Sequence, residues 1–337
     1  MPEILRTTNE LESFRPEWEK LWSENPNATP FQHPAWLLPW WHCFGQDEAR
    51  AVVLRRDGKL VAFLPFYIYK EPDSGKRHLL MIGASTTDYL DGVFAPECAV
   101  QDVSEAIQFL RECGGWDTMN VTQIRPPSLL AQALLLTSAR KFHGERCWRI
   151  PVARVPDLPG RLRRNIMYYR NRAARHGTLD FRMANASSWA DYFAALTEQH
   201  TAHWRERGSD GVLASPRVQA WHRAAIPQLQ EAGLLRLCAL CLDGVPIAVA
   251  YSLADGAACP HRAQYFYVHT YSPDHAGFSP GTLLVAFAME HAAEEGIEAI
   301  DLLRGDEAYK QLWPSKPVRT LGFALPSKAL EHASQAA

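Results

Sequence analysis

Two Asp-Gly pairs limit what this chain can fold into more than any other feature. Asp57-Gly58 lies between the apolar runs 51–54 and 60–69, and Asp243-Gly244 lies between the runs 234–242 and 245–253. Asp-Gly supplies the two left-handed residues that a two-residue hairpin turn needs. We therefore expect one antiparallel hairpin in each half of the sequence.

The elements around the two hairpins also repeat. The first half predicts helices at 10–22, 104–113 and 129–140, with strands at 78–83 and 117–124 besides its hairpin. The second half predicts helices at 189–205, 216–231 and 281–295, with strands at 178–183, 263–271 and 298–303. The order helix, hairpin, strand, helix, strand thus occurs twice, which predicts an α/β fold with mixed sheets and a duplicated architecture.

Length and a proline-rich segment give the domain boundary. The chain has 337 residues, enough for roughly two domains of about 150 residues each. Residues 151–160, PVARVPDLPG, contain three prolines and one glycine and form the best linker candidate. We expect domains at 1–150 and 151–337.

Composition excludes several classes of protein. The net charge is -2 and the pI is about 6.7, so the chain as a whole does not attract nucleic acid or an anionic membrane. The seven cysteines are scattered, and Cys238 and Cys241 would face opposite sides of a strand, so neither a disulfide framework nor a metal site is predicted. The glutamate-bearing N-terminus does not read as a secretory signal, and no apolar run approaches the ~18 residues of a membrane span. We expect a cytoplasmic protein.

Two segments carry the residues for chemistry. In DLLRGDEAYK, 301–310, an apolar strand runs directly into charged residues. In HTYSPDHAGFSPGTLL, 269–284, a strand leads through a loop to a helix with Ser279 as N-cap and Pro280 as first residue. The first turn of such a helix favours anions. Both segments follow strands that flank one helix, so they should meet at one edge of the sheet, where ligands bind in such folds. The alternative is a solvated loop beside a well-capped helix.

These motifs resemble a known superfamily. Tyr271-Ser272-Pro273, Phe278-Ser279-Pro280-Gly281 and the run from Asp301 to Trp313 are similar to GNAT acyltransferases, and more narrowly to CelD-like acetyltransferases first associated with bacterial cellulose biosynthesis. The segments 31–36, 88–91 and 161–177 fit the same group. That group is related to the Fem aminoacyltransferases of peptidoglycan synthesis, which contain two GNAT folds. The resemblance implies two tandem GNAT-like folds, with a degenerate acceptor-side lobe first and the donor lobe second.

The resemblance also implies a thioester donor, acetyl-coenzyme A or another acyl-coenzyme A, and no metal. The residues expected to hold the donor are His269, Tyr271, Phe278, Ser279, Gly281, Thr282 and Leu283. The glycine-rich signature of the superfamily is replaced here by Gly277-Phe278-Ser279-Pro280-Gly281. Either coenzyme A binds this altered loop, or the loop accepts a different carrier.

Direct transfer to an amine asks for few groups. A carboxylate must take the proton of the amine, and adjacent carboxylates raise one another's pKa. We expect Glu307 to be the base, Asp306 to position the substrate or act as a second base, and Lys310 to stabilise the developing oxyanion. Arg304 either contacts substrate or pairs with Asp301 or Asp306. Structural ion pairing is the alternative for each of these residues.

A second set of polar residues belongs to the first half. Asp88, Tyr89 and Asp91 lie in GASTTDYLDG, where they either form an ordinary turn or bind a cationic acceptor amine. His33 and Trp36 would line the same acceptor site, although Trp36 also suits a core. The acceptor is expected to be a small amine or an amino sugar.

One predicted helix is strongly basic. Arg161, Arg164, Arg172 and Arg175 share a face with Tyr168, opposite an apolar stripe, and Arg163 and Arg170 extend the patch. The sequence places Gly177 to end this helix. The face is either solvated or binds phosphates, a membrane surface or a transfer RNA. Two other functions therefore stay open: a Fem-like transferase that uses aminoacyl-tRNA, and a binding protein without catalysis.

Overall fold

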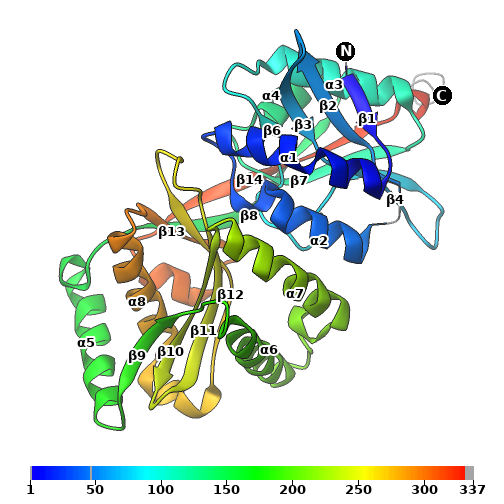
Figure 1. The fold of residues 1–337 in the computed structure, drawn as a ribbon. Helices are drawn as coiled ribbons and strands as arrows, with labels where there is room; N and C mark the ends of the chain where they lie inside the picture. Colours follow the sequence, from blue (N-terminus) through cyan, green and yellow to red (C-terminus); the bar gives the residue numbers. More distant parts are fainter. Residues whose placement is uncertain (1, 46–47, 331–337) are drawn as a thin grey trace. The chain divides into compact units, whose positions relative to one another are not determined.

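The computed structural model describes residues 2–45 and 48–330 and divides the chain into two compact units. Unit 1 comprises residues up to 146 together with those from 319, and unit 2 comprises 147–318. Strands β8 (Arg140–Pro151) and β14 (Lys316–Pro326) each begin in one unit and end in the other (Figure 1). Residues 319–326, expected in the second domain, group with unit 1 because Leu321 to Pro326 pair antiparallel with Ile124 to Thr118.

Unit 1 contains two sheets and four helices of the described chain. Its elements are β1 (Pro2–Leu5), α1 (Thr8–Glu24), α2 (Pro34–Phe44), β2 (Ala51–Arg56), β3 (Lys59–Leu64), β4 (Phe66–Lys70), β5 (Arg77–Met81), β6 (Val93–Phe94), α3 (Val100–Cys113), β7 (Thr118–Ile124) and α4 (Leu129–Leu135), besides the short 3-10 turn η1 (Pro30–Gln32). One sheet has the order β1-β2-β3-β6, and the other runs β4-β5-β7-β14. Fully buried aromatic side chains, including Trp18, Trp36 and Phe63, form much of the core.

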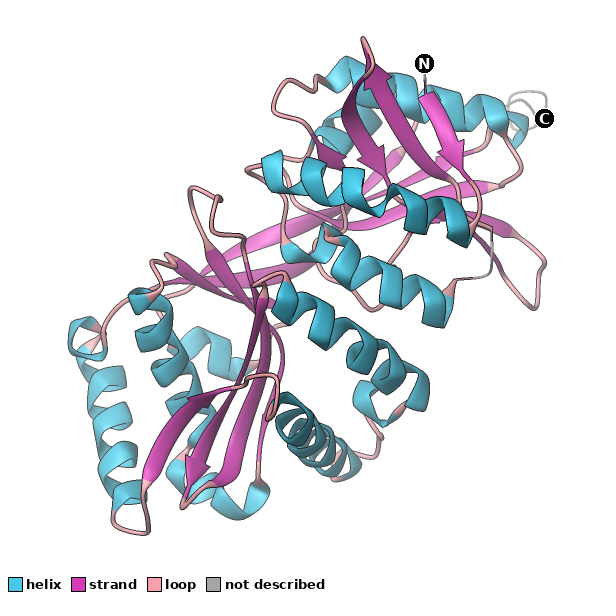
Figure 2. Ribbon diagram, in the orientation of Figure 1, coloured by secondary structure: helices cyan, strands magenta, loops and turns pink. Residues whose placement is uncertain are grey.

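Unit 2 is a mixed sheet with helices on both faces. Its elements are η2 (Val155–Asp157), α5 (Gly160–Ala174), β9 (Leu179–Met183), α6 (Trp189–Arg205), η3 (Val212–Ala214), α7 (Pro216–Glu231), β10 (Leu235–Leu242), β11 (Val245–Ala254), β12 (Ala263–Tyr271), η4 (Pro273–Phe278), α8 (Pro280–Glu294), β13 (Ala299–Arg304) and η5 (Ala308–Leu312). The strand order is β8-β13-β12-β11-β10-β9. Figure 2 shows α5 and α8 on one face of these strands and α6 and α7 on the other.

Both predicted hairpins are confirmed. Asp57 and Gly58 have φ of 50° and 77° between β2 and β3, and Asp243 and Gly244 have φ of 50° and 81° between β10 and β11. The predicted duplication of element order is also present, because each unit joins a parallel strand pair through a helix. These pairs are β5 with β7 through α3, and β12 with β13 through α8.

Strands β12 and β13 diverge after a short paired stretch, and this feature positions the candidate site. Their described pairing runs from Ala263↔Ala299 to Tyr265↔Asp301, although β12 continues to Tyr271 and β13 to Arg304. Beyond that point the β13–β8 register shifts, and Leu303 adopts a left-handed conformation with φ of 56°. Irregular strand ends of this kind occur next to active sites, where they redirect side chains.

Candidate active site

The loop after β12 and the start of α8 form one side of the site. Helix α8 begins at Pro280, as the sequence predicts. Ser279 occupies the N-cap position but is left-handed (φ 49°, ψ 51°), and its hydroxyl donates to Thr282 Oγ1 at 3.1 Å instead of capping a backbone N–H. A Cβ on Gly281 would lie 3.4 Å from Cδ1 of Tyr271, so the ring of Tyr271 packs beside the first turn of α8.

The remaining expected donor residues differ in exposure. Phe278 is half-buried, and its ring centre lies 5.1 Å from that of His176 at the end of α5. Leu283 is fully buried in the core beneath α8. The segment 271–283 therefore offers Tyr271, Phe278, Ser279, Gly281 and Thr282 at partly exposed positions, whereas Leu283 serves packing.

His269 lies on β12 beyond its pairing with β13. Its ring centre is 5.9 Å from that of Phe266 and 5.2 Å from that of Tyr309 in η5. Burial, helped by the nearby Lys310 ammonium and opposed by the Glu307 carboxylate, lowers the pKa of His269 to about 4. The imidazole is therefore neutral at pH 7.

Lys310 lies at the centre of the charged run. Only 2% of its surface is exposed, and its ammonium donates to the carbonyl oxygens of Leu303 (3.2 Å), Arg304 (2.5 Å) and Gly305 (3.4 Å). The same Nζ lies 2.9 Å from Oε2 of Glu307. This ammonium therefore ties the end of β13 and the Glu307 carboxylate together.

The two carboxylates are held from different elements. The Glu307 side chain remains 58% exposed, and its carboxylate occupies the space above Gly305, where a Cβ would lie 2.5 Å from Oε2. Gly305 has φ of 109°, which only glycine adopts readily. Asp306 Oδ1 accepts a hydrogen bond from the Trp148 indole at 3.3 Å. The charged run is thus an ordered arrangement that presents Glu307 to solvent.

The sequence did not identify two neighbours of this arrangement, Trp148 and Tyr309. Trp148 belongs to β8, which the sequence pattern did not predict as a strand. Tyr309 lies within the quoted charged run, but its ring contact with His269 depends on how η5 folds back towards β12. The aromatic character of Tyr309 next to Lys310 is the one signal that could have marked it.

The expected acceptor residues gather in unit 1. Trp36 is fully buried and donates its indole N–H to Thr87 Oγ1 at 3.0 Å. His33 caps α2 by accepting the Ala35 N–H at its Nδ1 (3.1 Å), and burial lowers its pKa to about 3. Both side chains therefore support the fold of this region.

The loop that carries Asp88, Tyr89 and Asp91 is tightly organised. Asp88 is 4% exposed, and Tyr89 is left-handed with φ of 47° and lies beneath the Arg125 guanidinium, 5.5 Å from the ring centre. Asp91 Oδ1 accepts the Gly92 N–H and the Ser128 hydroxyl, both at 2.8 Å. Burial nevertheless raises the pKa of Asp91 to about 6.

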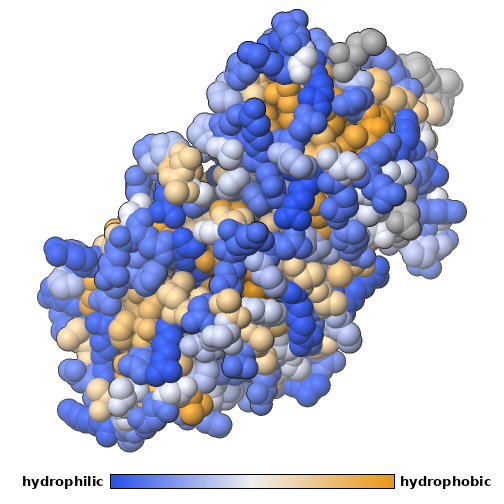
Figure 3. Space-filling view, in the orientation of Figure 1, coloured by the Kyte–Doolittle hydropathy of each residue, from blue (hydrophilic) through white to orange (hydrophobic). Residues whose placement is uncertain are grey.

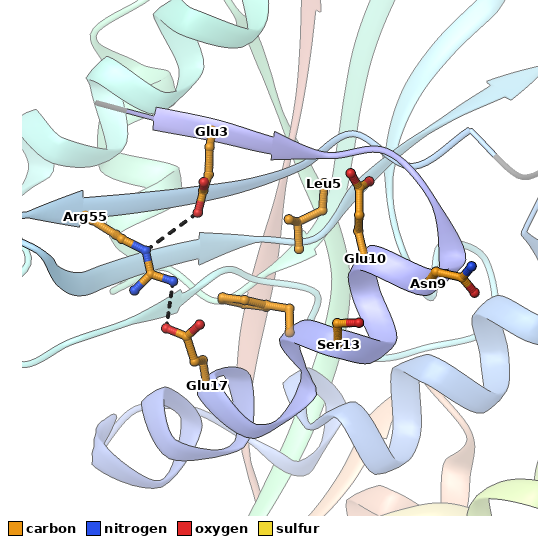
Figure 4. A pocket seen from close by; sticks show the side chains of 8 residues that line it. Glu3, Leu5, Asn9, Glu10, Ser13, Glu17 and Arg55 are labelled. Atoms are coloured by element: carbon orange, nitrogen blue, oxygen red, sulfur yellow. Dashed lines mark ion pairs between the residues drawn. The ribbon is translucent and has the colours of Figure 1, made fainter.

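A hollow of about 370 Å³ lies elsewhere in unit 1, between β1, α1 and β2 (Figure 4). Its lining includes Glu3, Glu17 and Arg55, and the Arg55 guanidinium is 2.6 Å from Glu17 and 3.6 Å from Glu3. In Figure 3 hydrophobic side chains gather over this part of unit 1 and are interrupted by hydrophilic ones. None of the expected site residues lines the hollow. Its arginine is already paired with Glu3 and Glu17, and Glu10, which also lines it, accepts the Thr7 N–H at 2.9 Å.

Metal-binding clusters and membrane-spanning helices are both absent from residues 2–45 and 48–330. No group of three or more His, Cys, Asp or Glu side chains in that part of the chain could hold a metal ion. Within the same residues, no helix combines the length and the apolar character needed to cross a membrane.

Comparison with known proteins supports this description of the fold. Residues 160–311 match the family model of the acetyltransferase (GNAT) domain. FemX superimposes with a TM-score of 0.71 at 11% identity, covering 99% of both chains. The C-terminal domain of a putative lysylphosphatidylglycerol synthetase from Agrobacterium fabrum gives a TM-score of 0.58 at 15% identity over 92% of both chains. A tandem GNAT protein from the clavulanic acid biosynthesis pathway gives 0.52 at 13% identity, covering 97% of this chain and 99% of the other.

The sequence matches none of the curated proteins with which it was compared. At these identities the structural likenesses show the fold, and the expected tandem GNAT-like architecture is confirmed.

Proposed function

We propose that this protein is an N-acyltransferase of the CelD-like type, acting in the cytoplasm. It moves an acyl group, acetyl in the simplest case, from acyl-coenzyme A to the amine of a small molecule or amino sugar. The observation that carries the proposal is Glu307, whose carboxylate is exposed at the end of β13 while the buried Lys310 ammonium holds it in place. The GNAT match over residues 160–311 supports an acyltransferase in this unit.

The reaction needs one base and no metal. The amine nitrogen attacks the thioester carbonyl carbon, Glu307 accepts the amine proton, and the C–S bond breaks to release the thiolate, which is then protonated. Asp306, fixed by the Trp148 indole, positions the amine or acts as a second base. His269 and Tyr271 flank the thioester on the β12 side, and the segment 278–283 meets the rest of the donor. Arg304 contacts the substrate.

Lys310 takes a different part from the one that the sequence suggests. Its ammonium already donates to three carbonyl oxygens and pairs with Glu307, so it has no proton directed at a developing oxyanion. We assign it the positioning of Glu307.

The test is a calorimetric titration of acetyl-coenzyme A and desulfo-coenzyme A into wild-type protein and the Glu307→Gln variant, with thiol release measured against a panel of amines. We expect micromolar binding by both proteins and a loss of turnover of about 10²–10⁴-fold in the variant. Glu294→Gln, which alters an exposed carboxylate at the end of α8, is the matched control and should leave turnover unchanged. Absence of binding by any coenzyme A, or full turnover by Glu307→Gln, would refute the proposal.

A further inference from the structure

Helix α5 presents a line of exposed arginines that have no part in the proposed function. Arg161, Arg164, Arg172 and Arg175 are all exposed, while Leu162, Ile166 and Ala173 of the same helix are buried. The sequence has no Asp or Glu from residue 158 to residue 179. In the part of the chain that the structure describes, no ion pair involves any of these four arginines, so their charge is available to a ligand.

Arg170 shows how the helix is held in place. Its guanidinium pairs with Glu290 of α8 at 2.6 Å and lies 4.0 Å from the ring centre of Phe287. This contact fixes α5 against α8 and removes Arg170 from the exposed set. The remaining arginines therefore project from a helix with a defined orientation relative to α8.

The two ends of α5 differ in what they face. At its end, Arg172 Nη2 lies 3.6 Å from the position that a Cβ on Gly277 would occupy, and the ring of His176 contacts Phe278. At its beginning, Arg163 donates to the Pro156 carbonyl, within the segment that precedes the helix. The end of α5 thus meets the segment between β12 and α8, to which the proposed function assigns the donor.

We propose that Arg172 binds a phosphate group of the thioester donor and so selects a phosphorylated donor over a bare pantetheine thioester. This inference rests on the proposed function for the position of the thioester. The planar guanidinium donates two parallel hydrogen bonds to phosphate, which makes arginine suited to this recognition. Because Gly277 has no side chain, the guanidinium lies close to the backbone of η4, and a phosphate bound beside Arg172 can contact both.

The charge around this position favours an anion. Arg172 approaches from α5, Arg175 is the exposed residue that ends this helix, and η4 contributes one exposed carboxylate, Asp274. The local excess is positive, in a chain whose net charge is -2.

The experiment compares three acetyl thioesters that differ in phosphate content: acetyl-coenzyme A, acetyl-phosphopantetheine and acetyl-pantetheine. For Arg172→Ala we expect KM for acetyl-coenzyme A to rise about tenfold with kcat unchanged, and KM for acetyl-pantetheine to stay as in wild type. Arg161→Ala is the matched control, since it removes an exposed arginine of the same line about 16 Å earlier along the helix. It should change neither substrate. Equal effects of Arg172→Ala on all three thioesters, or no effect on any, would overturn the inference.

The intermediate thioester identifies the source of the phosphate. If Arg172→Ala also weakens acetyl-phosphopantetheine, the arginine reads the phosphate shared by coenzyme A and a carrier-protein arm. If only acetyl-coenzyme A is affected, it reads a phosphate of the nucleotide. Either result supports a phosphate contact.

A binding measurement separates this inference from the proposed function. Adenosine 3′,5′-bisphosphate is titrated into wild type, Arg172→Ala and Arg161→Ala. Suppose that Arg172→Ala alone binds the bisphosphate more weakly and that the wild-type protein transfers no acyl group. This result would support the phosphate site and refute the acyltransferase proposal. If the wild-type protein transfers acyl groups but Arg172→Ala matches it with every phosphorylated ligand, the acyltransferase proposal stands and the phosphate site is refuted.

Discussion

Replacing Lys310 with methionine tests whether its ammonium holds the end of β13. Methionine has a similar length and fills the same space, so the change removes hydrogen bonds and charge with little change in packing. Three carbonyl oxygens lose a donor, and the one on Leu303 lies in a residue that is only 3% exposed. A buried acceptor left without a partner costs about 1–3 kcal/mol, whereas water can reach the half-buried Arg304 and Gly305.

Loss of the ion pair with Glu307 adds little to the destabilisation that the unpaired carbonyl groups cause. The Glu307 side chain is 58% exposed, so losing its cationic partner costs about 0–1 kcal/mol. We therefore expect Lys310→Met to lower the unfolding free energy of unit 2 by about 1–4 kcal/mol. Glu307→Gln, which keeps the ammonium and its carbonyl contacts, should lower it by less than about 1 kcal/mol.

The assay is urea unfolding together with hydrogen exchange of the backbone amides from 301 to 310. Faster exchange in this segment should accompany the loss of stability in Lys310→Met. Lys316→Met, which alters an exposed lysine on β14, should stay within about 0.5 kcal/mol of wild type. If Lys310→Met were as stable as that control and exchanged like wild type, the ammonium would not be holding the segment.

Three further predictions concern titration and backbone space. The folded pKa of Asp91, about 6, exceeds the ordinary value of 3.8 for an aspartate, so the folded state keeps a proton that the unfolded state releases, and stability falls as pH rises from about 4 to 6. Asp91→Asn should abolish this fall, worth up to about 3 kcal/mol, in unfolding free energies measured from pH 3.5 to 7; an unchanged slope would contradict it. Burial lowers the pKa of His222 from 6.5 to about 3, so stability is complete above pH 6.5 and is lost as pH falls. His222→Phe should lose about 2 kcal/mol less than wild type between pH 7 and pH 5, and parallel curves would refute this. Gly305→Ala should reduce turnover as strongly as Glu307→Gln, because its Cβ would displace that carboxylate. Gly208→Ala, also at positive φ but with open space around it, should leave turnover unchanged, and equal activity of the two glycine variants would argue against displacement.

Local chemistry made part of the fold predictable. The Asp-Gly turns carry their own left-handed preference, and the helices predicted at 189–205 and 216–231 have the same bounds in the structure. The helix expected at 129–140 ends at Leu135, five residues before β8 begins. Strand β8 was not predicted from the sequence, because RKFHGERCWRIP has no regular alternation of apolar residues along its length. Its strand conformation comes from pairing with β13 and β14, which are distant in sequence.

Gly177 shows the same limit at one residue. The sequence suggests a left-handed glycine that ends α5. In the structure Gly177 instead allows the Asp243 side chain to come close to the backbone, since a Cβ at this position would lie 2.3 Å from Asp243 Oδ2. The other carboxylate oxygen, Oδ1, accepts the Thr178 N–H at 2.7 Å. Absence of a side chain is required at this position, but the reason lies in the turn between β10 and β11. A pattern within one helix cannot reveal a contact with a residue so far along the chain.

The sequence likewise predicts only part of the candidate site. That Glu307 and Lys310 lie three residues apart follows from the sequence, and their pairing is local. The direction of the Lys310 ammonium does not, because it depends on backbone carbonyls that converge only when Leu303 and Gly305 adopt positive φ. The anchoring of Asp306 by Trp148 joins residues 158 positions apart.

The left-handed Leu303 gives the clearest physical reason to connect this segment with function. A bulky residue in that conformation costs about 1–2 kcal/mol, and a regular strand would avoid the cost. Two contacts offset it: Asp301 Oδ1 accepts the Leu303 N–H at 2.8 Å, and Lys310 binds the Leu303 carbonyl. The segment thus uses a buried carboxylate and a buried ammonium to maintain an unfavourable backbone. Packing alone would not require this, because Leu302 and Leu303 could both be buried by a straight strand end. Strain held in place by dedicated side chains is typical of sites where the chain must present a group in one orientation, and the group presented here is Glu307.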